Sequence, residues 1–298
     1  MLKEYIVYQI DAFTKEKFHA NPAGVVVNAD GLSDDLMQKI ARELNNSETA
    51  FVFKNSSNNY SHEVRFFTPS AEVPVCSHAT IATHYALALE KNIKQNTIFE
   101  QKCKAGIFEV EVKVKNNDYF VTMAYDEIEF LNKLNQKEIE ILTKALGLKE
   151  EELIKELPIQ VVSTGHSKVL VAIKDYQTLD ALKPNMQELA KLSECIDCNG
   201  YFVFTFDTKE KNILTQGRMF APAIGINEDP VTGNAHTPLA PFLHKYKFSN
   251  IKDTFSFYAK QGKTIGREGK VFVEFFPREN KVKITGEAVV VFKTKLLI

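Results

Sequence analysis

Two short stretches, Arg65-Phe-Phe-Thr-Pro69 and Arg218-Met-Phe-Ala-Pro222, decide the predicted architecture because they repeat one pattern about half a chain apart. They share Arg, Phe and Pro in register, and each is followed by an acidic loop and a turn of small residues that opens an apolar helix. The turns read Ser77-His-Ala-Thr80 in the first copy and Gly233-Asn-Ala-His236 in the second. Similarity at a fixed spacing indicates duplication, so we predict two domains of like architecture.

The second copy departs from the first in its loop and its helix. It carries about three extra loop residues, and two prolines, Pro238 and Pro241, follow its turn. A proline in the first turn of a helix is tolerated, whereas one further along removes a hydrogen bond and clashes with the preceding turn. We therefore expect Pro241 to kink or interrupt the second helix.

Composition and charge exclude several classes of protein. The 298 residues are 44% hydrophobic and 25% charged, as in soluble globular proteins with a sizeable core. The formal charge of -1 gives no bulk attraction for nucleic acid or an anionic membrane. Apolar runs fall short of the roughly 20 residues of a membrane span, and the N-terminus lacks the continuous apolar segment of a secretory signal. We expect a cytoplasmic protein.

Strands outnumber helices in the predicted secondary structure. Period-2 patterns rich in Val, Ile, Phe and Tyr predict strands at 5–13, 24–27, 49–53, 63–67, 97–101, 107–114, 119–124, 160–164, 169–173, 201–206, 213–220, 254–261, 270–276 and 282–292. Apolar residues at helical spacing predict helices at 33–44, 77–91, 135–146, 149–156 and 185–195. The segment 126–133 separates two similar successions of strands. We place the N-terminal domain at 1–128 and the C-terminal domain at 129–288.

Four cysteines are too few for a disulfide scaffold in a chain of this length. Cys195 and Cys198 have the spacing of half a zinc site, but neither Cys76 nor Cys103 sits in a second pair. We therefore predict free thiols and no bound metal.

The turns of the repeat suggest where a ligand binds. The first turn of a helix presents unpaired N–H groups and the positive end of the helix dipole, which together hold a carboxylate. Small residues let a ligand approach the backbone there, and both turns supply them at Ser77, Ala79, Gly233 and Ala235. The alternative is that these residues only let a buried helix pack closely.

Candidate acid/base residues flank these turns. Glu48 lies between the first helix and an apolar strand, where hydrophobic neighbours suit a carboxyl group to proton transfer. Glu72 and Asp229 occupy the two loops of the repeat, and His78 stands at the start of the first apolar helix. Histidine can donate to a ligand or carry a proton near neutral pH.

These residues fall in motifs that together resemble the PhzF family of phenazine-biosynthesis-like proteins. The motifs run in order along the chain, together with the Gln261-Gly262 and Gly266-Arg267 segments: Asp11-Ala-Phe13, Asn21-Pro-Ala-Gly-Val25, Asn46-Ser-Glu-Thr-Ala-Phe51, Phe67-Thr-Pro69, Glu72-Val-Pro-Val-Cys-Ser-His-Ala-Thr80, Arg218-Met-Phe-Ala-Pro222 and Glu228-Asp-Pro-Val-Thr-Gly-Asn-Ala235. The resemblance covers the chain from Asp11 to about Gly286.

The resemblance implies the diaminopimelate-epimerase-like α/β fold. In that fold two pseudo-symmetric domains, each a curved, mostly antiparallel sheet around a central helix, hold the active site between them. The last strand often returns to the first domain, which here would be residues 289–298.

It also implies a cofactor-independent isomerase that moves a proton on a small carboxylated metabolite. The acid/base glutamate carries over to Glu48, the site histidine to His78 and the site aspartate to Asp229. Where the phenazine members have Ser in a Gly-Ser-Ala turn, this chain has Asn234. We expect no metal or organic cofactor, no nucleic-acid or membrane partner, and a homodimer.

Two other functions stay open. Racemases and epimerases of this fold use two thiols, one at each helix N-terminus, and Cys76 occupies the first of these positions. The matching residue of the second copy is Thr232, whose hydroxyl cannot return a proton as a thiol does. Cys76 is therefore expected first to line the site, and a thiol-dependent epimerase is the alternative enzyme. The remaining alternative is a metabolite-binding protein without catalysis.

Overall fold

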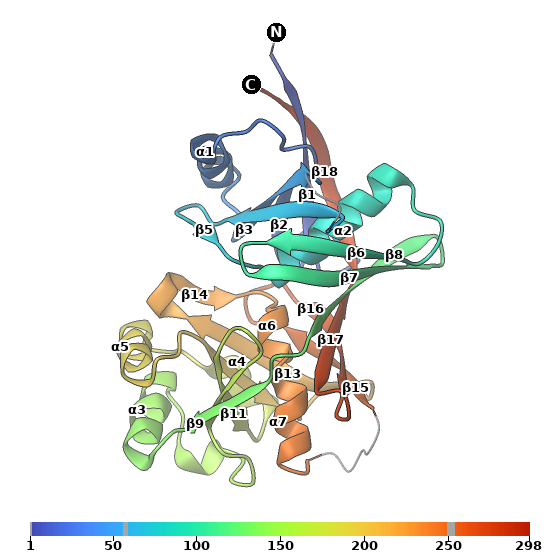
Figure 1. Ribbon diagram of the computed structural model, residues 1–298. Coiled ribbons are helices and arrows are strands. Elements are labelled where there is room, and N and C mark those ends of the chain that lie inside the picture. Colours follow the sequence, from blue (N-terminus) through green and yellow to red (C-terminus); the bar gives the residue numbers. More distant parts are fainter. Residues whose placement is uncertain (1, 56–58, 249–253) are drawn as a thin grey trace. The chain divides into compact units, whose positions relative to one another are not determined.

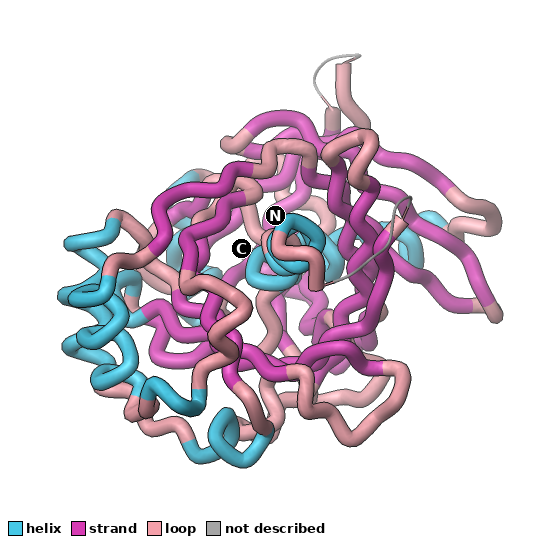
Figure 2. The backbone as a smooth tube through the Cα atoms, turned by 90° about the horizontal axis from the view of Figure 1, so that it is seen from below, coloured by secondary structure: helices cyan, strands magenta, loops and turns pink. Residues whose placement is uncertain are grey.

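The computed structural model describes residues 2–55, 59–248 and 254–298. The chain divides into unit 1, made of Met1–Ala124 and Thr285–Ile298, and unit 2, made of Tyr125–Ile284. Strands outnumber helices, as both views show (Figures 1 and 2). No helix in the described part of the chain is long and apolar enough to cross a membrane.

Unit 1 is built on a mostly antiparallel set of strands. Its strands are β1 (Glu4–Ala12), β2 (Asn21–Val26), β3 (Glu48–Lys54), β4 (His62–Phe67), β5 (Glu72–Val73), β6 (Thr97–Cys103), β7 (Gly106–Lys115), β8 (Asp118–Tyr125) and β18 (Ala288–Leu297). Strands β18, β1, β2, β3, β4, β6, β7 and β8 pair in this order, and β5 pairs with β4. The β2–β3 and β4–β6 pairs are parallel. Figure 1 shows β18 running beside β1, so the last strand of the chain belongs to unit 1.

Helix α2 (Ser77–Lys91) is the central helix of unit 1. Every residue from Ser77 to Ala88 is buried, and the helix contacts β1, β2, β3, β7 and β18. Its sequence leaves almost no polar face, because Ala, Ile, Leu and Tyr recur on all sides. The helix predicted from near Ser77 to about Lys91 is confirmed.

Helix α1 (Asp34–Leu44) packs its apolar face on unit 1. Its N-cap is Ser33, whose side chain accepts from the Leu36 amide, and Asp34 and Asp35 lie in its first turn. Met37, Ile40 and Ala41 are buried in a cluster with residues such as Val7, Phe51 and Phe67. The helix predicted at 33–44 is confirmed, with Ser33 as its N-cap.

Unit 2 repeats the strand pattern of unit 1. Its strands are β9 (Glu129–Lys133), β10 (Gln160–Ser163), β11 (Lys168–Ile173), β12 (Tyr201–Thr205), β13 (Ile213–Ala221), β14 (Ile226–Asp229), β15 (Phe255–Gln261), β16 (Gly269–Phe276) and β17 (Lys281–Gly286). The β11–β12 and β13–β15 pairs are parallel, while β9–β10, β10–β11, β12–β13, β13–β14 and β15–β16 are antiparallel. From β10 to β16 this is the order of β1 to β7, which confirms the repeat read from the sequence.

The helices of unit 2 are α3 (Gln136–Leu146), α4 (Tyr176–Ala181), α5 (Met186–Ile196), α6 (Gly233–His236) and α7 (Leu239–Lys245), with 3₁₀ turns η1 (Glu150–Glu152) and η2 (Pro222–Ile224). Helices α3 and α5 lie side by side in Figure 1 and share a core with β10–β13. Asn135 caps α3, and Gly147 ends it in the left-handed conformation. The helix predicted at 135–146 is thereby confirmed.

The second apolar helix is interrupted, as its prolines predict, but the break lies earlier than Pro241. Helix α6 ends at His236 and α7 begins at Leu239. Pro241 has no N–H for the Thr237 carbonyl, and Pro238 has none for the Asn234 carbonyl. The missing bonds therefore separate the two helices at residues 237–238, although both residues keep right-handed helical dihedrals.

Other predicted elements are wrong in detail. The helix expected at 149–156 is only η1, because Leu153 bridges to Ile173 and the Ile154 amide bonds the Ala172 carbonyl, which draws the chain out along β11. Residues 129–133 form β9 instead of a plain connection. The single strand expected at 282–292 is two strands, β17 and β18. Helix α4 was not predicted, although Asp175 is a typical N-cap residue and caps it.

Candidate functional site

Glu48 is held at the start of β3 by the elements before and beside it. Helix α1 ends at Asn45, which is left-handed, and the side chains of Asn46 and Gln9 exchange two hydrogen bonds of 2.7 and 2.9 Å. Ala23 of β2 pairs with Glu48 in the parallel ladder. The backbone of Glu48 is therefore fixed on both sides before its side chain reaches the site.

Gly24, the glycine of the Asn-Pro-Ala-Gly motif, stands where a side chain has no room. A Cβ added at Gly24 would lie 2.9 Å from both Leu44 Cδ1 and Thr49 Oγ1. Only glycine lets β2 come this close to the end of α1 and to the residue that follows Glu48.

Cys76 and His78 stand at the N-terminus of α2. Cys76 is the N-cap residue in an extended conformation, and its carbonyl accepts a 2.7 Å hydrogen bond from the Thr80 hydroxyl. His78 lies in the first turn, and the side chains of Ser77 and Ala79 on either side of it are buried. The central helix thus places a thiol and an imidazole at its positive end.

Glu48, Cys76 and His78 form one cluster. Glu48 Oε2 lies 3.2 Å from His78 Nε2, and Cys76 Sγ lies 3.4 Å from His78 Nδ1 and 3.8 Å from Nε2. Cys76 and His78 are 6% and 5% exposed, and Glu48 is half-buried. The imidazole is therefore within ion-pair distance of the carboxylate and within hydrogen-bond distance of the thiol, which brings the three groups into contact.

This cluster supports two kinds of chemistry. A half-buried carboxylate held by an imidazole can take a proton from carbon and return it, and a thiol beside an imidazole can become a nucleophile or a base. Its carboxylate oxygen, imidazole nitrogen and sulfur all lie within 4.8 Å of one another, so the same three residues could hold a metal ion.

Glu72, a candidate acid from its loop position, has a structural partner. Its carboxylate accepts from Arg65 Nε at 2.8 Å and Nη2 at 3.1 Å, and this hydrogen bonding lowers the pKa of Glu72. The carboxylate is thus kept ionised and bound, which argues against a role in proton transfer.

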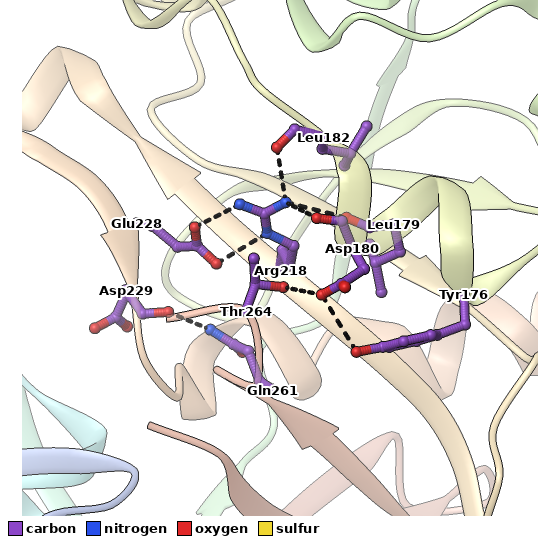
Figure 3. Close-up of polar contacts among 9 residues, drawn as sticks. All are labelled: Tyr176, Leu179, Asp180, Leu182, Arg218, Glu228, Asp229, Gln261 and Thr264. Carbon is purple, nitrogen blue, oxygen red and sulfur yellow. Dashed lines mark hydrogen bonds and ion pairs between the residues drawn. The ribbon is translucent and has the colours of Figure 1, made fainter. Parts of the chain in front are cut away.

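The repeat places the same pair in unit 2. Arg218 Nε and Nη2 donate to Glu228 at 3.0 and 2.7 Å, and its Nη1 donates to the carbonyls of Leu179 and Leu182 (Figure 3). In each unit the strand arginine therefore holds a glutamate four residues before the helix cap, Cys76 or Thr232. The loop aspartate Asp229 is the residue after that glutamate, so it is not the counterpart of Glu72.

Asp229 belongs to a second polar cluster, in unit 2. Its carboxylate accepts a hydrogen bond from the Thr232 hydroxyl. Its backbone carbonyl accepts from Gln261 Nε2 at 2.7 Å (Figure 3). Gln261 Nε2 also bonds Thr232 Oγ1 at 3.1 Å, and its Oε1 accepts from the Thr232 amide at 3.2 Å. Gln261 therefore ties the loop that carries Asp229 to the end of β15.

The small-residue turn of unit 2 differs from the expected anion site. Gly233 and Ala235 are buried and lie in α6, which has only four residues, so its dipole is much shorter than that of α2. Gly233 has no left-handed φ, and the turn does not depend on glycine's conformational freedom. Asn234 accepts a 3.1 Å hydrogen bond from the Tyr125 hydroxyl, which orients its side chain.

The structure thus brings the predicted residues into two groups, each within its own unit. Unit 1 holds Glu48, Cys76, Ser77, His78 and Ala79, and unit 2 holds Asp229, Gly233, Asn234 and Ala235. Of the residues that the structure describes, neither Cys195 nor Cys198 belongs to a group of three or more metal-ligating side chains.

Sequence reasoning missed the supporting residues Tyr125, Lys168 and the side-chain role of Gln261. Lys168 is a buried lysine on β11; burial lowers its pKa, while Cys198 and Asp229 act in the opposite direction. A lysine beside the apolar run 169–173 is a weak signal, because strand ends carry lysine often.

Two units of like topology, each with mostly antiparallel strands around a buried helix, define the diaminopimelate-epimerase-like α/β fold, as predicted. The chain belongs to the phenazine biosynthesis-like (PhzC-PhzF) family, whose model matches residues 10–294. A crystal structure of the Bacillus anthracis phenazine biosynthesis protein of the PhzF family superposes with a TM-score of 0.89 at 31% identity, covering 99% of this chain and 100% of that one.

Curated relatives support the enzyme class. An uncharacterised isomerase of Clostridium acetobutylicum is 51% identical over the full length of both chains. The trans-2,3-dihydro-3-hydroxyanthranilate isomerase of Pseudomonas chlororaphis is 30% identical over 97% of each chain. The predicted class, an isomerase, is thereby confirmed.

Proposed function

We propose that this isomerase moves a proton on a small carboxylated metabolite without a metal or an organic cofactor, with Glu48 as its acid/base. The observation that carries the proposal is the 3.2 Å contact between Glu48 Oε2 and His78 Nε2 at the N-terminus of α2. A carboxylate in this position lies beside an imidazole that can orient it, and hydrophobic strand residues limit its contact with water.

Glu48 alone can both remove and return the proton. Its carboxylate takes a proton from a carbon of the substrate, and the electron pair of the broken C–H bond delocalises into the adjoining unsaturated system. The protonated Glu48 then returns the proton to another carbon, so the double bond moves and Glu48 regains its charge. No proton is gained or lost overall.

His78 and Asp229 are proposed to position the substrate and the charge. The imidazole lies 3.2 Å from the Glu48 carboxylate, in the first turn of α2, where the backbone N–H groups favour a substrate carboxylate. The Asp229 carboxylate accepts from the Thr232 hydroxyl, and Gln261 holds the backbone carbonyl of Asp229. We assign roles to Asp229 and to the turn that contains Asn234 because both match motifs of the family.

The named substrate of a relative gives the first compound to test. Trans-2,3-dihydro-3-hydroxyanthranilate carries a ring carboxylate, the group expected to bind at a helix N-terminus. Asn234 replaces the Ser of the phenazine members, so we propose a related carboxylate as the physiological substrate.

The deciding experiment is proton exchange with solvent deuterium, followed by NMR over a panel of carboxylates that includes this compound. Glu48→Gln should lower exchange at least about a hundredfold, because the amide keeps the shape but cannot accept and return a proton. Glu109→Gln, on the exposed side of β7, is the matched control and should retain full exchange. Near-full turnover by Glu48→Gln would exclude Glu48 as the acid/base.

The second candidate is a thiol-dependent epimerase, favoured by the 3.4 Å contact of Cys76 Sγ with His78 Nδ1. Cys76→Ser separates it from the first: the variant keeps exchange if Glu48 is the base and loses it if the thiol is. Binding of carboxylates with no exchange in the wild-type protein would instead favour a non-catalytic binding protein.

A further inference from the structure

The cluster at the start of α2 has the composition of a zinc site. Glu48 offers a carboxylate oxygen, His78 a ring nitrogen and Cys76 a sulfur, and these three donor types are the ones that Zn²⁺ binds in proteins. Among the described residues this is the group of His, Cys, Asp and Glu side chains whose ligand atoms converge, within 4.8 Å of one another.

The distances between the donor atoms fit a common metal centre. Zinc lies about 2.3 Å from sulfur and about 2.0–2.2 Å from nitrogen or oxygen, so tetrahedral ligand atoms stand roughly 3.3–3.6 Å apart. Here Glu48 Oε2 is 3.2 Å and Cys76 Sγ is 3.8 Å from His78 Nε2. Adjustments of a few tenths of an ångström bring both pairs to the ideal spacing.

The charge and the burial of the three side chains also favour a bound cation. A thiolate and a carboxylate together bring two negative charges into a site where Cys76 and His78 are buried, and a divalent cation neutralises them. Burial of charge is costly unless it is compensated. The soft sulfur ligand favours zinc over magnesium or calcium, which prefer oxygen ligands only.

We infer that Glu48, Cys76 and His78 bind Zn²⁺ as a three-ligand site and that the bound ion inhibits the isomerase. The inference that zinc binds rests on the geometry, charge and burial of the donor groups and does not depend on the proposed function. The inhibition rests on the proposed function, because zinc occupies the carboxylate that must accept the proton and the imidazole that orients it. The fourth tetrahedral position is left to water.

The binding is tested without activity, using Co²⁺ as a spectroscopic probe on the full chain freed of metal with a chelator. Wild-type protein should show the intense thiolate-to-cobalt absorption together with tetrahedral d–d bands, and added Zn²⁺ should remove both. Zinc affinity is then measured by competition with a fluorescent chelator. Cys76→Ser should abolish the thiolate absorption, and Cys76→Ser and His78→Gln should each weaken zinc binding at least about a hundredfold, beyond the 10–100-fold typical of lost supporting contacts.

Two control variants use the other cysteines. Cys103→Ser removes another buried thiol of unit 1, and the double variant Cys195→Ser/Cys198→Ser removes the pair with half-site spacing in unit 2. Both should keep the cobalt spectrum. If the absorption survives Cys76→Ser but disappears in the double variant, or if Mg²⁺ competes equally with Zn²⁺, the assignment is overturned.

Inhibition is measured separately, as the zinc concentration that halves deuterium exchange. That concentration should match the dissociation constant from chelator competition. Full exchange at saturating zinc would refute the inhibition while the cobalt result still decides the site. If Glu48→Gln keeps near-full exchange, the proposed function is refuted. The cobalt spectrum and the zinc affinity of the wild-type protein then still decide whether zinc binds.

Discussion

His78 Nε2 lies 3.2 Å from Glu48 Oε2, a contact that joins the first turn of α2 to the first residue of β3. Both elements are fixed by other contacts, α2 by its burial in unit 1 and β3 by its pairing with β2 and β4. The geometry of the candidate acid/base is therefore a property of the folded unit and does not depend on a flexible loop.

His78→Ala and Asp229→Asn should each weaken substrate binding and turnover together, because both residues are assigned to positioning. Loss of one charge-assisted hydrogen bond costs roughly 1.5–3 kcal/mol, or about ten- to a hundredfold in kcat/KM. Steady-state kinetics and calorimetric titration with the same carboxylate provide the two measurements. Asn at position 229 keeps an oxygen that can accept from Thr232, so the loop should stay intact. Unchanged affinity in both variants would remove the positioning role.

The two arginines of the repeat should differ in their effect on stability. Arg218 is 6% exposed and is bound to Glu228 and to two backbone carbonyls. Arg218→Ala leaves the Glu228 carboxylate, whose side chain is 10% exposed, without its partner and should cost about 3–5 kcal/mol. Arg65 is bound in the same way to Glu72, but its side chain is 23% exposed, and Arg65→Ala should cost about 1 kcal/mol. Equilibrium unfolding in urea compares them. Equal losses would show that burial does not set the difference.

Gly262 and Gly266 form a matched pair in the loop after β15. Both have left-handed φ angles, of 89° and 68°, so Ala at either site carries a backbone cost of roughly 1–2 kcal/mol. A Cβ at Gly262 would also lie 2.2 Å from the Arg267 carbonyl oxygen and 2.5 Å from that of Pro230, whereas the space around Gly266 is open.

Gly262→Ala should therefore be the more destabilising variant by a further 1–3 kcal/mol or so. It should also lower activity, because Pro230 adjoins Asp229. Thermal unfolding and exchange assays on both proteins give the comparison. A Gly266→Ala variant as damaged as Gly262→Ala would mean that backbone strain alone explains the loss.

Stability should fall as the pH falls from about 6.5 to about 4. Burial lowers the pKa of His62 from 6.5 to about 4, and Lys91 adds to the effect. The ring of His84 lies 5.0 Å from that of His62, and burial lowers the pKa of His84 as well. Burial also lowers the pKa values of His166 and His236 to about 4. In this pH range the unfolded chain binds protons that the folded protein does not, so the free energy of unfolding decreases with decreasing pH.

His62→Phe isolates one contribution to this slope. Phenylalanine can take the place of the imidazole against Phe99 and His84, and it cannot bind a proton. The loss of stability between pH 6.5 and 4 should shrink by roughly 3 kcal/mol, the value of the shift in the pKa of His62. Urea unfolding at several pH values measures the slope. An unchanged slope would show that His62 already binds its proton in the folded protein.

The sequence was sufficient for elements whose signals are local. The helices predicted at 33–44 and 135–146 form there, because Ser33, Asn135 and Gly147 cap them and a cap depends on residues within one turn. Helix α2 was predictable because its apolar residues leave no polar face. The repeat was visible because the same strand, loop and helix pattern occurs twice, and the pairing of β10–β16 follows that of β1–β7.

Local signals failed where the neighbours of a segment decided its conformation. The helix expected at 149–156 gave way to a bridge with β11, and the strand expected at 282–292 divided where the chain passes from unit 2 to unit 1. Propensity is a weak prior when a segment can pair with an existing sheet edge.

For the candidate site, residue types and order along the chain were enough to select Glu48, Cys76, His78 and Asp229. Their contacts were decided by tertiary structure: the glutamates that bind Arg65 and Arg218, the imidazole between a carboxylate and a thiol, and the amide of Gln261 on the Asp229 loop. A side chain's partner across elements depends on how strands and helices pack, since a shift of one residue in strand register turns every side chain to the opposite face.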